Sequence, residues 1–164
     1  MRAILFLVLV LITLEVFSQD YESALGFRTG ANTGIIYKKM INDERGLEAM
    51  LSFQRGGNQL VVVRQFYHPI FLEHTSQLFF FYGHGARLGY SLYSLENYVI
   101  NGEYFKRKSF SVGVGVDACL GFEYHFVKYP MVLTAEYKPY VQINVPVSVE
   151  NGYADFSLGI FYTF

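Results

Sequence analysis

The last ten residues of the chain read Asp155-Phe156-Ser157-Leu158-Gly159-Ile160-Phe161-Tyr162-Thr163-Phe164. Apolar side chains occupy one parity and small or polar side chains the other, with Phe161 as the single exception. Because alternate residues of a β-strand point to opposite faces, this segment predicts a strand with one apolar and one mostly polar face. An exposed apolar strand face is unfavourable in water and favourable against lipid. We therefore expect this face to meet a membrane.

A longer stretch repeats the pattern without an exception. Between residues 110 and 126, nine apolar side chains alternate strictly with small, polar or charged ones. The apolar positions are Phe110, Val112, Val114, Val116, Ala118, Leu120, Phe122, Tyr124 and Phe126. Strict alternation separated by turn signals predicts strands and no helix.

The alternation and the turn residues together divide the chain into eight strands. Their predicted ranges are 22–30, 34–41, 46–55, 59–68, 77–91, 108–126, 131–145 and 153–164. The fourth is expected to end before Pro69, which has no N–H to donate. The break at 31–33 is the weakest, since 22–41 could form one strand and leave seven. Bacterial barrels have even strand numbers, so the predicted fold is an all-β, eight-stranded, antiparallel up-and-down transmembrane barrel.

The connections sort by length between the two ends of such a barrel. If the first strand runs outward, the outer loops are 31–33, 56–58, 92–107 and 146–152. The periplasmic connections are then 42–45, 69–76 and 127–130. The longest connection falls outside, where these barrels carry their long loops.

The amino terminus has the features of a secretory signal peptide. Met1-Arg2 precedes an apolar run from Ile4 to Ile12, and Val16-Phe17-Ser18 suits a cleavage site. The apolar run is shorter than the ~20 residues of a spanning helix. The predicted organisation is a signal peptide over 1–18 and one barrel domain over 19–164, secreted to the outer membrane.

Composition favours the membrane barrel over its soluble alternatives. The chain is 52% hydrophobic and 18% aromatic but only 16% charged. A soluble ligand-binding barrel or β-sandwich would need more charge on its outer face. The formal net charge of −1 gives no electrostatic reason to expect nucleic acid. The single cysteine, Cys119, excludes an internal disulfide.

If the apolar parity faces lipid, the other parity faces the lumen, where charges can pair and fill a narrow barrel. The predicted lumen network, a structural one, comprises Arg28, Lys38, Glu48, Arg64, Arg87, Asp117, Glu123, Glu136, Lys138 and Asp155. Glycines on the fifth and sixth strands would make room for the long side chains. An aqueous pore needs about 16 strands, so at most a narrow channel is expected.

Aromatic side chains near strand ends predict the interfacial belts of a membrane barrel, although strands are enriched in aromatics in any case. The candidates are Tyr37, Tyr67, Tyr90, Tyr124, Phe126, Tyr129, Tyr137, Tyr153 and Tyr162.

No motif predicts catalysis, a metal site or a cofactor. His68, His74, His84 and His125 lack zinc-ligand spacing. His84 or His125 could join Ser111 or Glu123 in a hydrolase, but no G-x-S-x-G nucleophile motif supports this. Gly113-Val114-Gly115 is not a dinucleotide fingerprint. We expect no enzyme; a lipid hydrolase or acyltransferase barrel and a narrow channel are the alternatives.

Several segments resemble small outer-membrane β-barrel proteins of Bacteroidetes-type bacteria, which are similar in architecture to OmpA and OmpX. These are 26–39, 46–53, His68-Pro69, 82–86 and Tyr162-Thr163-Phe164. The resemblance covers most of residues 19–164. It implies the barrel fold and does not imply a specific activity. It also implies that the terminal aromatic, Phe164, is the signal read by the barrel-assembly machinery.

The sequence thus predicts an outer-membrane barrel with a side-chain-filled lumen and a structural or surface-interaction role. Its expected partners are outer-membrane lipid, lipopolysaccharide and, during biogenesis, the assembly machinery. We expect a monomer, with no cofactor.

Overall fold

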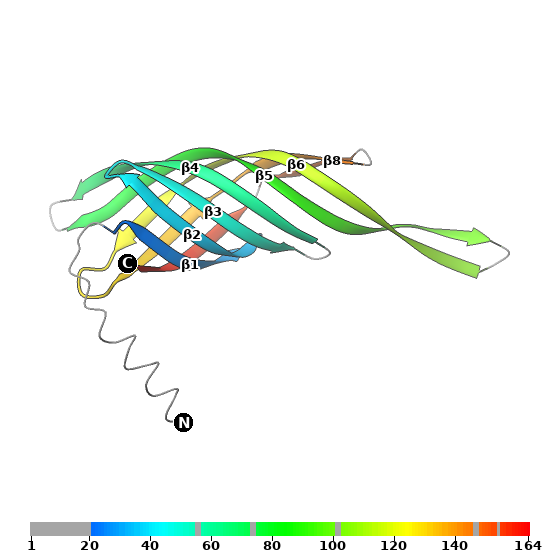
Figure 1. Ribbon diagram of the computed structural model, residues 1–164, viewed down its shortest axis with the longest axis horizontal. Helices are drawn as coiled ribbons and strands as arrows, with labels where there is room; N and C mark the ends of the chain where they lie inside the picture. The colour runs from blue at the N-terminus through cyan, green and yellow to red at the C-terminus, as the bar shows by residue number, and fades with distance from the viewer. Residues whose placement is uncertain (1–20, 55–56, 73–74, 101–102, 146–147, 154) are drawn as a thin grey trace, which may run out of the picture.

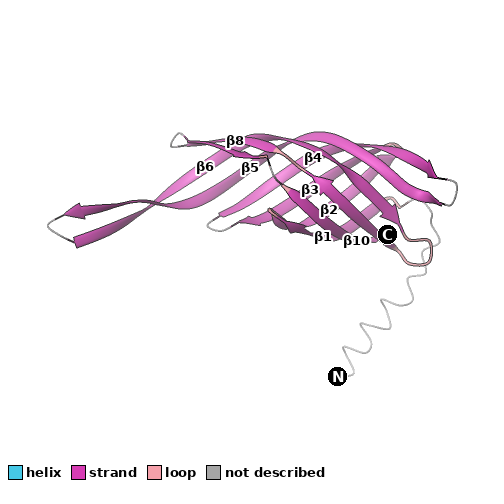
Figure 2. Ribbon diagram, turned by 180° about the vertical axis from the view of Figure 1, so that it is seen from behind, coloured by secondary structure: helices cyan, strands magenta, loops and turns pink. Residues whose placement is uncertain are grey.

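The computed structural model describes residues 21–54, 57–72, 75–100, 103–145, 148–153 and 155–164, and the predicted signal peptide lies outside them. Within these residues the chain is built from antiparallel strands, and no helix is long and apolar enough to cross a membrane (Figures 1 and 2). The strands are β1 (Ser23–Gly30), β2 (Thr33–Asn42), β3 (Arg45–Gln54), β4 (Gly57–Leu72), β5 (Thr75–Ile100), β6 (Glu103–His125), β7 (Met131–Tyr137), β8 (Tyr140–Val145), β9 (Ser148–Gly152) and β10 (Phe156–Thr163).

The strands close into an eight-stranded up-and-down barrel, which confirms the predicted fold. Each strand from β1 to β6 pairs with the next, and β1 pairs with β10 to close the cylinder. The ten segments occupy eight positions, because β7 and β8 both pair with β6, while β10 pairs with β7 and β9 with β8. The predicted break at 31–33 is also confirmed, since β1 and β2 are an antiparallel pair.

The predicted seventh strand, 131–145, is interrupted where the sequence places a proline. Residues Lys138 and Pro139 separate β7 from β8. Pro139 cannot donate to a ladder, but its carbonyl accepts the Ala118 amide at 3.0 Å, and the Lys138 amide donates to the Asp155 carbonyl at 2.9 Å. The interruption therefore leaves the chain in the wall and brings Lys138 to the lumen.

The prediction that the fourth strand ends before Pro69 is wrong. Pro69 pairs with Phe79, and β4 continues to Leu72. The Tyr67 amide donates to the carbonyl of Glu44, in the turn before β3. Two residues later, the nitrogen of Pro69 faces the same side of β4, toward β3. β3 begins at Arg45, opposite Phe66, so no residue of β3 lies beside Pro69. The missing N–H therefore breaks no hydrogen bond of the ladder.

The predicted loop 92–107 is also wrong, because most of it is a β-hairpin. β5 and β6 stay paired as far as Ile100 and Glu103, beyond the last residues that pair with β4 and β8. Figure 1 shows this ribbon projecting from one end of the barrel. The intervening sequence, Asn101-Gly102, is the strongest two-residue hairpin signal, and the surrounding residues are rich in β-formers.

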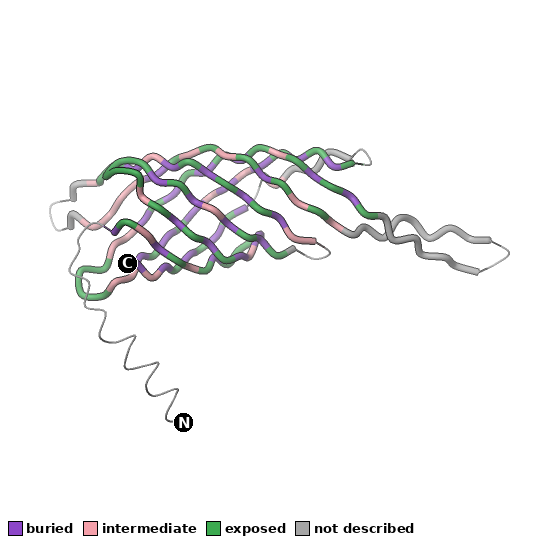
Figure 3. The backbone as a smooth tube through the Cα atoms, in the orientation of Figure 1, coloured by how far each residue is buried: buried purple, intermediate pink, exposed green. Residues whose placement is uncertain are grey.

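The two ends of the barrel differ. One end, here called the C-terminal rim, holds Phe164, the Asp43-Glu44 turn and the loop 126–130, and the Ser23 amide donates to the Phe164 carbonyl there. The other end, the hairpin rim, carries the Ala31-Asn32 turn and the β5–β6 ribbon. Where burial is described, inward and outward residues alternate along the strands of the barrel (Figure 3).

Candidate functional site: the lumen and its mouth

The lumen holds most of the predicted charged residues. Four cationic side chains and five carboxylates are buried inside the described barrel. They are Arg28, Lys38, Arg87, Lys138, Glu48, Asp117, Glu123, Glu136 and Asp155. Their inward positions bring these residues together, and they form three groups of ion pairs.

Arg64 is not among them, so its predicted place in the lumen network is wrong. Its side chain is exposed on the outer wall, and the guanidinium carbon lies 5.3 Å from the ring centre of Phe66. β4 carries apolar residues on both parities, so its alternation does not distinguish the faces, and Val61 and Val63 point inward instead. An arginine facing hydrocarbon costs about 2–4 kcal/mol near the midplane.

Glu123 is the centre of the cluster nearer the C-terminal rim. Its side chain is 0% exposed, and its two oxygens contact hydrogen-bonding groups of β2, β4, β6 and the segment before β1. Oε2 accepts from Lys38 Nζ at 2.6 Å, while Oε1 accepts from the Tyr21 hydroxyl at 2.6 Å and lies 2.8 Å from His125 Nε2. These bonds tie β2, β6 and the segment before β1 across the barrel.

Lys38 is enclosed by aromatic rings as well as by its carboxylate partner. Its Nζ lies 4.6 Å from the ring centre of Phe161, 5.4 Å from that of Phe81 and 5.6 Å from that of Tyr67. Ring faces attract a desolvated cation. Phe161 is the residue that broke the terminal alternation, and its inward position is explained by this contact.

The second group of ion pairs includes Lys138 and Arg28. Its Nζ lies 2.6 Å from Glu48 Oε1 and 3.2 Å from Glu136 Oε1. Arg28 then joins Glu136 at 3.5 Å and Asp155 at 2.8 Å. Paired in this way, the charges offset the large penalty of leaving water.

The cluster nearer the hairpin rim is built on one arginine. Arg87 of β5 pairs with Asp117 of β6 and donates from a terminal nitrogen to Gln59 Oε1 at 3.0 Å. Its guanidinium carbon lies 3.4 Å from the ring centre of Tyr140. One planar group thus links β4, β5, β6 and β8.

Two glycines of β6 lie where the lumen has no room for a larger side chain. A Cβ on Gly115 would lie 3.0 Å from Arg87 Cγ, and one on Gly121 would lie 2.8 Å from Phe81 Cζ. Both contacts are tighter than packed carbon atoms allow. These glycines therefore make room for the side chains that fill the lumen.

Sequence reasoning missed the neutral members of the lumen. Tyr67, predicted for the interfacial belt, is buried inside and donates to Gln65 Oε1 at 2.6 Å, while Gln65 Nε2 donates to Glu48 at 2.9 Å. Both lie on the parity of β4 opposite Arg64. Had the faces of β4 been assigned from Arg64 outward, the alternation would have placed them correctly.

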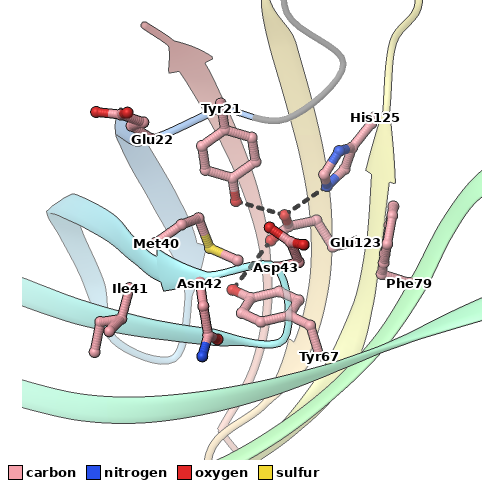
Figure 4. Close-up of a pocket in the computed structure, with 10 residues that line it drawn as sticks. All are labelled: Tyr21, Glu22, Met40, Ile41, Asn42, Asp43, Tyr67, Phe79, Glu123 and His125. Atoms are coloured by element: carbon pink, nitrogen blue, oxygen red, sulfur yellow. Dashed lines mark hydrogen bonds and ion pairs between the residues drawn. The ribbon is translucent and has the colours of Figure 1, made fainter.

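The C-terminal rim contains a cavity of about 470 Å³ that opens toward the end of the barrel. Figure 4 shows Tyr21, Glu123 and His125 meeting at its centre. Burial raises the pKa of Tyr21 well above its ordinary value, and the negative charge of Glu123 is the next largest cause. The Tyr21 hydroxyl therefore keeps the proton that it donates. The cavity is lined by Tyr21, Glu22, Met40, Ile41, Asn42, Asp43, Tyr67, Phe79, Glu123 and His125.

The candidate hydrolase residues do not converge in the part of the chain that the structure describes. His125 contacts Glu123, but Ser111 lies opposite Ser91 in the half of the barrel near the hairpin rim. His84 is exposed on the outer wall. Cys119 is a free, buried thiol, and no described group of His, Cys, Asp and Glu is arranged to hold a metal ion.

Comparison with solved structures supports the architecture. The N-terminal β-barrel domain of Pseudomonas aeruginosa OprF superposes with a TM-score of 0.50 at 12% identity, covering 89% of this chain and all of that one (100%). Neisserial surface protein A superposes with a TM-score of 0.53 at 15% identity, covering 87% of this chain and 93% of that one. No protein-family model and no curated protein sequence matches the chain. The chain therefore has the fold of eight-stranded outer-membrane barrels, while its resemblance to Bacteroidetes-type proteins stays a prediction.

Proposed function

We propose that the protein is an integral outer-membrane barrel with a closed lumen, and that its role is structural or lies in contacts at the cell surface. In this proposal it is not an enzyme and takes no cofactor. The C-terminal rim faces the periplasm and the β5–β6 hairpin projects outward.

One observation carries the proposal: the polarity of the barrel is inverted relative to a soluble protein. Charged side chains are buried inside, and large apolar side chains cover the outer wall on every strand whose wall side chains are described. Leu25 and Phe27 of β1, Leu88 of β5 and Val116 of β6 are typical, each about half exposed or more. Soluble proteins rarely expose contiguous apolar patches above a few hundred Å². A band of this kind around a whole barrel fits a lipid bilayer.

The closed lumen is supported by the burial of its ionic groups. Lys138 and Glu123 have side chains that are 0% exposed. The wall of an aqueous passage would be in contact with water, whereas these charges contact one another and the neighbouring rings. Salt bridges that cross the lumen thus block the route that a solute would follow.

The remaining partners belong to the proposal as well. Outer-membrane phospholipid and lipopolysaccharide would contact the apolar wall and the projecting hairpin. The barrel-assembly machinery would read Phe164, whose ring is exposed at the C-terminal rim while its amide and carbonyl pair with Ser23. We propose that the protein works as a monomer.

Folding into a membrane barrel predicts heat-dependent migration on a detergent gel. The chain without residues 1–18 should migrate faster unboiled than boiled, since closed barrels resist detergent unfolding. In intact cells, trypsin should cut at the sequence Lys106-Arg107-Lys108 in the projecting hairpin and spare Lys128 in the loop at the other rim. A monomer that stays dissolved without detergent, or cleavage at Lys128 alone, contradicts the proposal or its orientation.

A lumen filled by ion pairs predicts silence in planar bilayers. The refolded protein should give no discrete conductance steps under an applied potential, because the buried ion pairs of Lys38 with Glu123 and of Lys138 with Glu48 lie in the lumen. A large-barrel porin provides the positive control in the same bilayer. Reproducible steps that scale with the amount of folded protein would replace the closed barrel with the narrow channel.

A further inference from the structure

The described cationic residues of the outer wall lie on one side of the barrel. Among the strand side chains that the structure describes, the exposed Lys and Arg residues are Lys39 of β2, Arg45 of β3 and Arg64 of β4. The described outward residues of β1, β6, β7, β8 and β10 are apolar, small or hydroxyl-bearing. An ionisable side chain at membrane depth is energetically costly and is therefore a candidate functional site.

Strand register gathers these cations into one patch with two histidines. Lys39 pairs with Leu47, Leu47 with Arg64 and Arg64 with His84, so these residues form one row across four strands. In the next outward row toward the C-terminal rim, Arg45 pairs with Phe66 and Phe66 with Tyr82. The cationic patch is defined here as Lys39, Arg45, Arg64, Phe66, His68, Tyr82 and His84.

Aromatic rings form the floor of the cationic patch. The ring centres of Phe66 and Tyr82 are 5.5 Å apart, and those of His68 and Tyr82 are 5.6 Å apart and stacked. The ring centres of His84 and Phe66 are 6.1 Å apart. The rings thus contact the two imidazoles and the Arg64 guanidinium, and Arg64, His68 and His84 are all exposed residues.

Among the residues that the structure describes, the cations of the patch have no acidic partner. No ion pair joins Lys39, Arg45 or Arg64 to a described carboxylate, whereas the lumen cations are all paired. The neighbouring described acids, Glu22, Asp43 and Glu44, are exposed and lie beyond the ends of the strands. The patch is therefore complementary to an anion supplied from outside the chain.

The position of the patch indicates where that anion lies. Leu60 and Val62 flank Arg64 toward the hairpin rim, and both are exposed and apolar. The guanidinium lies over Phe66, which is nearer the C-terminal rim. Long basic side chains reach from an apolar surface to the nearest polar interface. Arg64 thus reaches toward the headgroup layer at the C-terminal rim, where Arg45 is already located.

We propose that the cationic patch binds the phosphate of an anionic phospholipid in the periplasmic leaflet. The site rests on the proposed function, because only a membrane-spanning barrel presents this wall to lipid. A guanidinium matches a phosphate with two parallel N–H donors, and the acyl chains would lie along the apolar wall beside Leu47 and Val62.

A second copy of the chain fits this surface less well. A two-fold dimer presses the same patch against itself, so Arg45 and Arg64 of one copy would face the same cations of the other. Among the described strand residues, the outer wall has no carboxylate that could offset this repulsion. A lipid phosphate supplies the missing negative charge without this conflict.

The test measures lipid selectivity of the folded barrel. The chain without residues 1–18 is refolded in phosphatidylcholine vesicles, and its association with spin-labelled phosphatidylglycerol is compared with that of spin-labelled phosphatidylcholine. Wild type should prefer phosphatidylglycerol, and Arg64→Met should reduce the preference by about five-fold. Lys128→Met is the matched control, because it removes one exposed cation at the same rim outside the patch and should change nothing.

Each outcome has a separate meaning. Equal association of both lipids with wild type, or an equal loss in the Lys128 and Arg64 variants, overturns the site while the heat-dependent gel shift still supports the barrel. A cross-linked dimer that disappears in the Arg64 variant overturns it in favour of a second copy. A chain that never shows the gel shift overturns the proposed function and this site together.

Discussion

Replacing Glu123 by glutamine is expected to lower the free energy of unfolding by about 3–5 kcal/mol, because it leaves a buried lysine without its counter-charge. The change keeps the shape of the side chain and removes only the charge that Lys38 contacts at 2.6 Å. Tyr21 and His125 also lose a strong acceptor. The chain has no tryptophan, so urea unfolding in vesicles is followed by far-ultraviolet circular dichroism and by the gel shift.

Two further variants separate the ion pair from a general effect of lost charge. Glu44→Gln removes a carboxylate from an exposed turn and should change stability by no more than about 0.5 kcal/mol. Adding Lys38→Met to Glu123→Gln removes the stranded cation and should restore part of the loss, since residues in contact are not additive. A loss below about 1 kcal/mol for Glu123→Gln would show that the pair does not hold the lumen together.

Replacing Val116 by arginine is expected to destabilise the barrel in a bilayer by about 2–4 kcal/mol. Val116 is 64% exposed on the outer wall, and its register partners, Ala86 and Val141, are also apolar and exposed. In water, such an exposed site would accept arginine with a change of about 0.5 kcal/mol or less. The size of the effect therefore reports whether the wall meets lipid.

Val127 provides the matched control for this change. It is 67% exposed but lies in the loop between β6 and β7, beyond the end of the wall. Val127→Arg should leave the urea midpoint nearly unchanged in the same vesicles. Equal, small effects for both valines would mean that the apolar wall faces water, and the membrane proposal would be wrong.

The sequence was informative wherever one parity was apolar and the other was not. On β6, the alternation from Phe110 to Tyr124 placed Asp117 and Glu123 on the inward face, where both are buried. On β4, apolar residues occupy both parities, so Arg64 was placed inside and Tyr67 outside, and both assignments were wrong. A strand with two apolar faces has no periodicity from which to read its direction.

The extent of strands was harder to predict than their number. Local propensity predicts interruptions at Pro69 and over 92–107, yet Pro69 and most of 92–107 lie in paired strands. A proline interrupts a ladder only where a neighbouring strand has a carbonyl that would accept a hydrogen bond from the missing N–H. That neighbour is a property of the closed sheet, which local sequence does not contain.

The sequence by itself determined the eight alternating strands and their antiparallel order, because side-chain parity and turn residues are local properties. Only the tertiary structure decided which charges meet, since Lys38 and Glu123 come from β2 and β6 and touch only when the cylinder closes. It also decided the cationic patch, because Lys39, Arg45 and Arg64 lie on three strands whose register sets their distance. Contacts across a barrel depend on closure and stagger, which arise from the whole sheet rather than from any one strand.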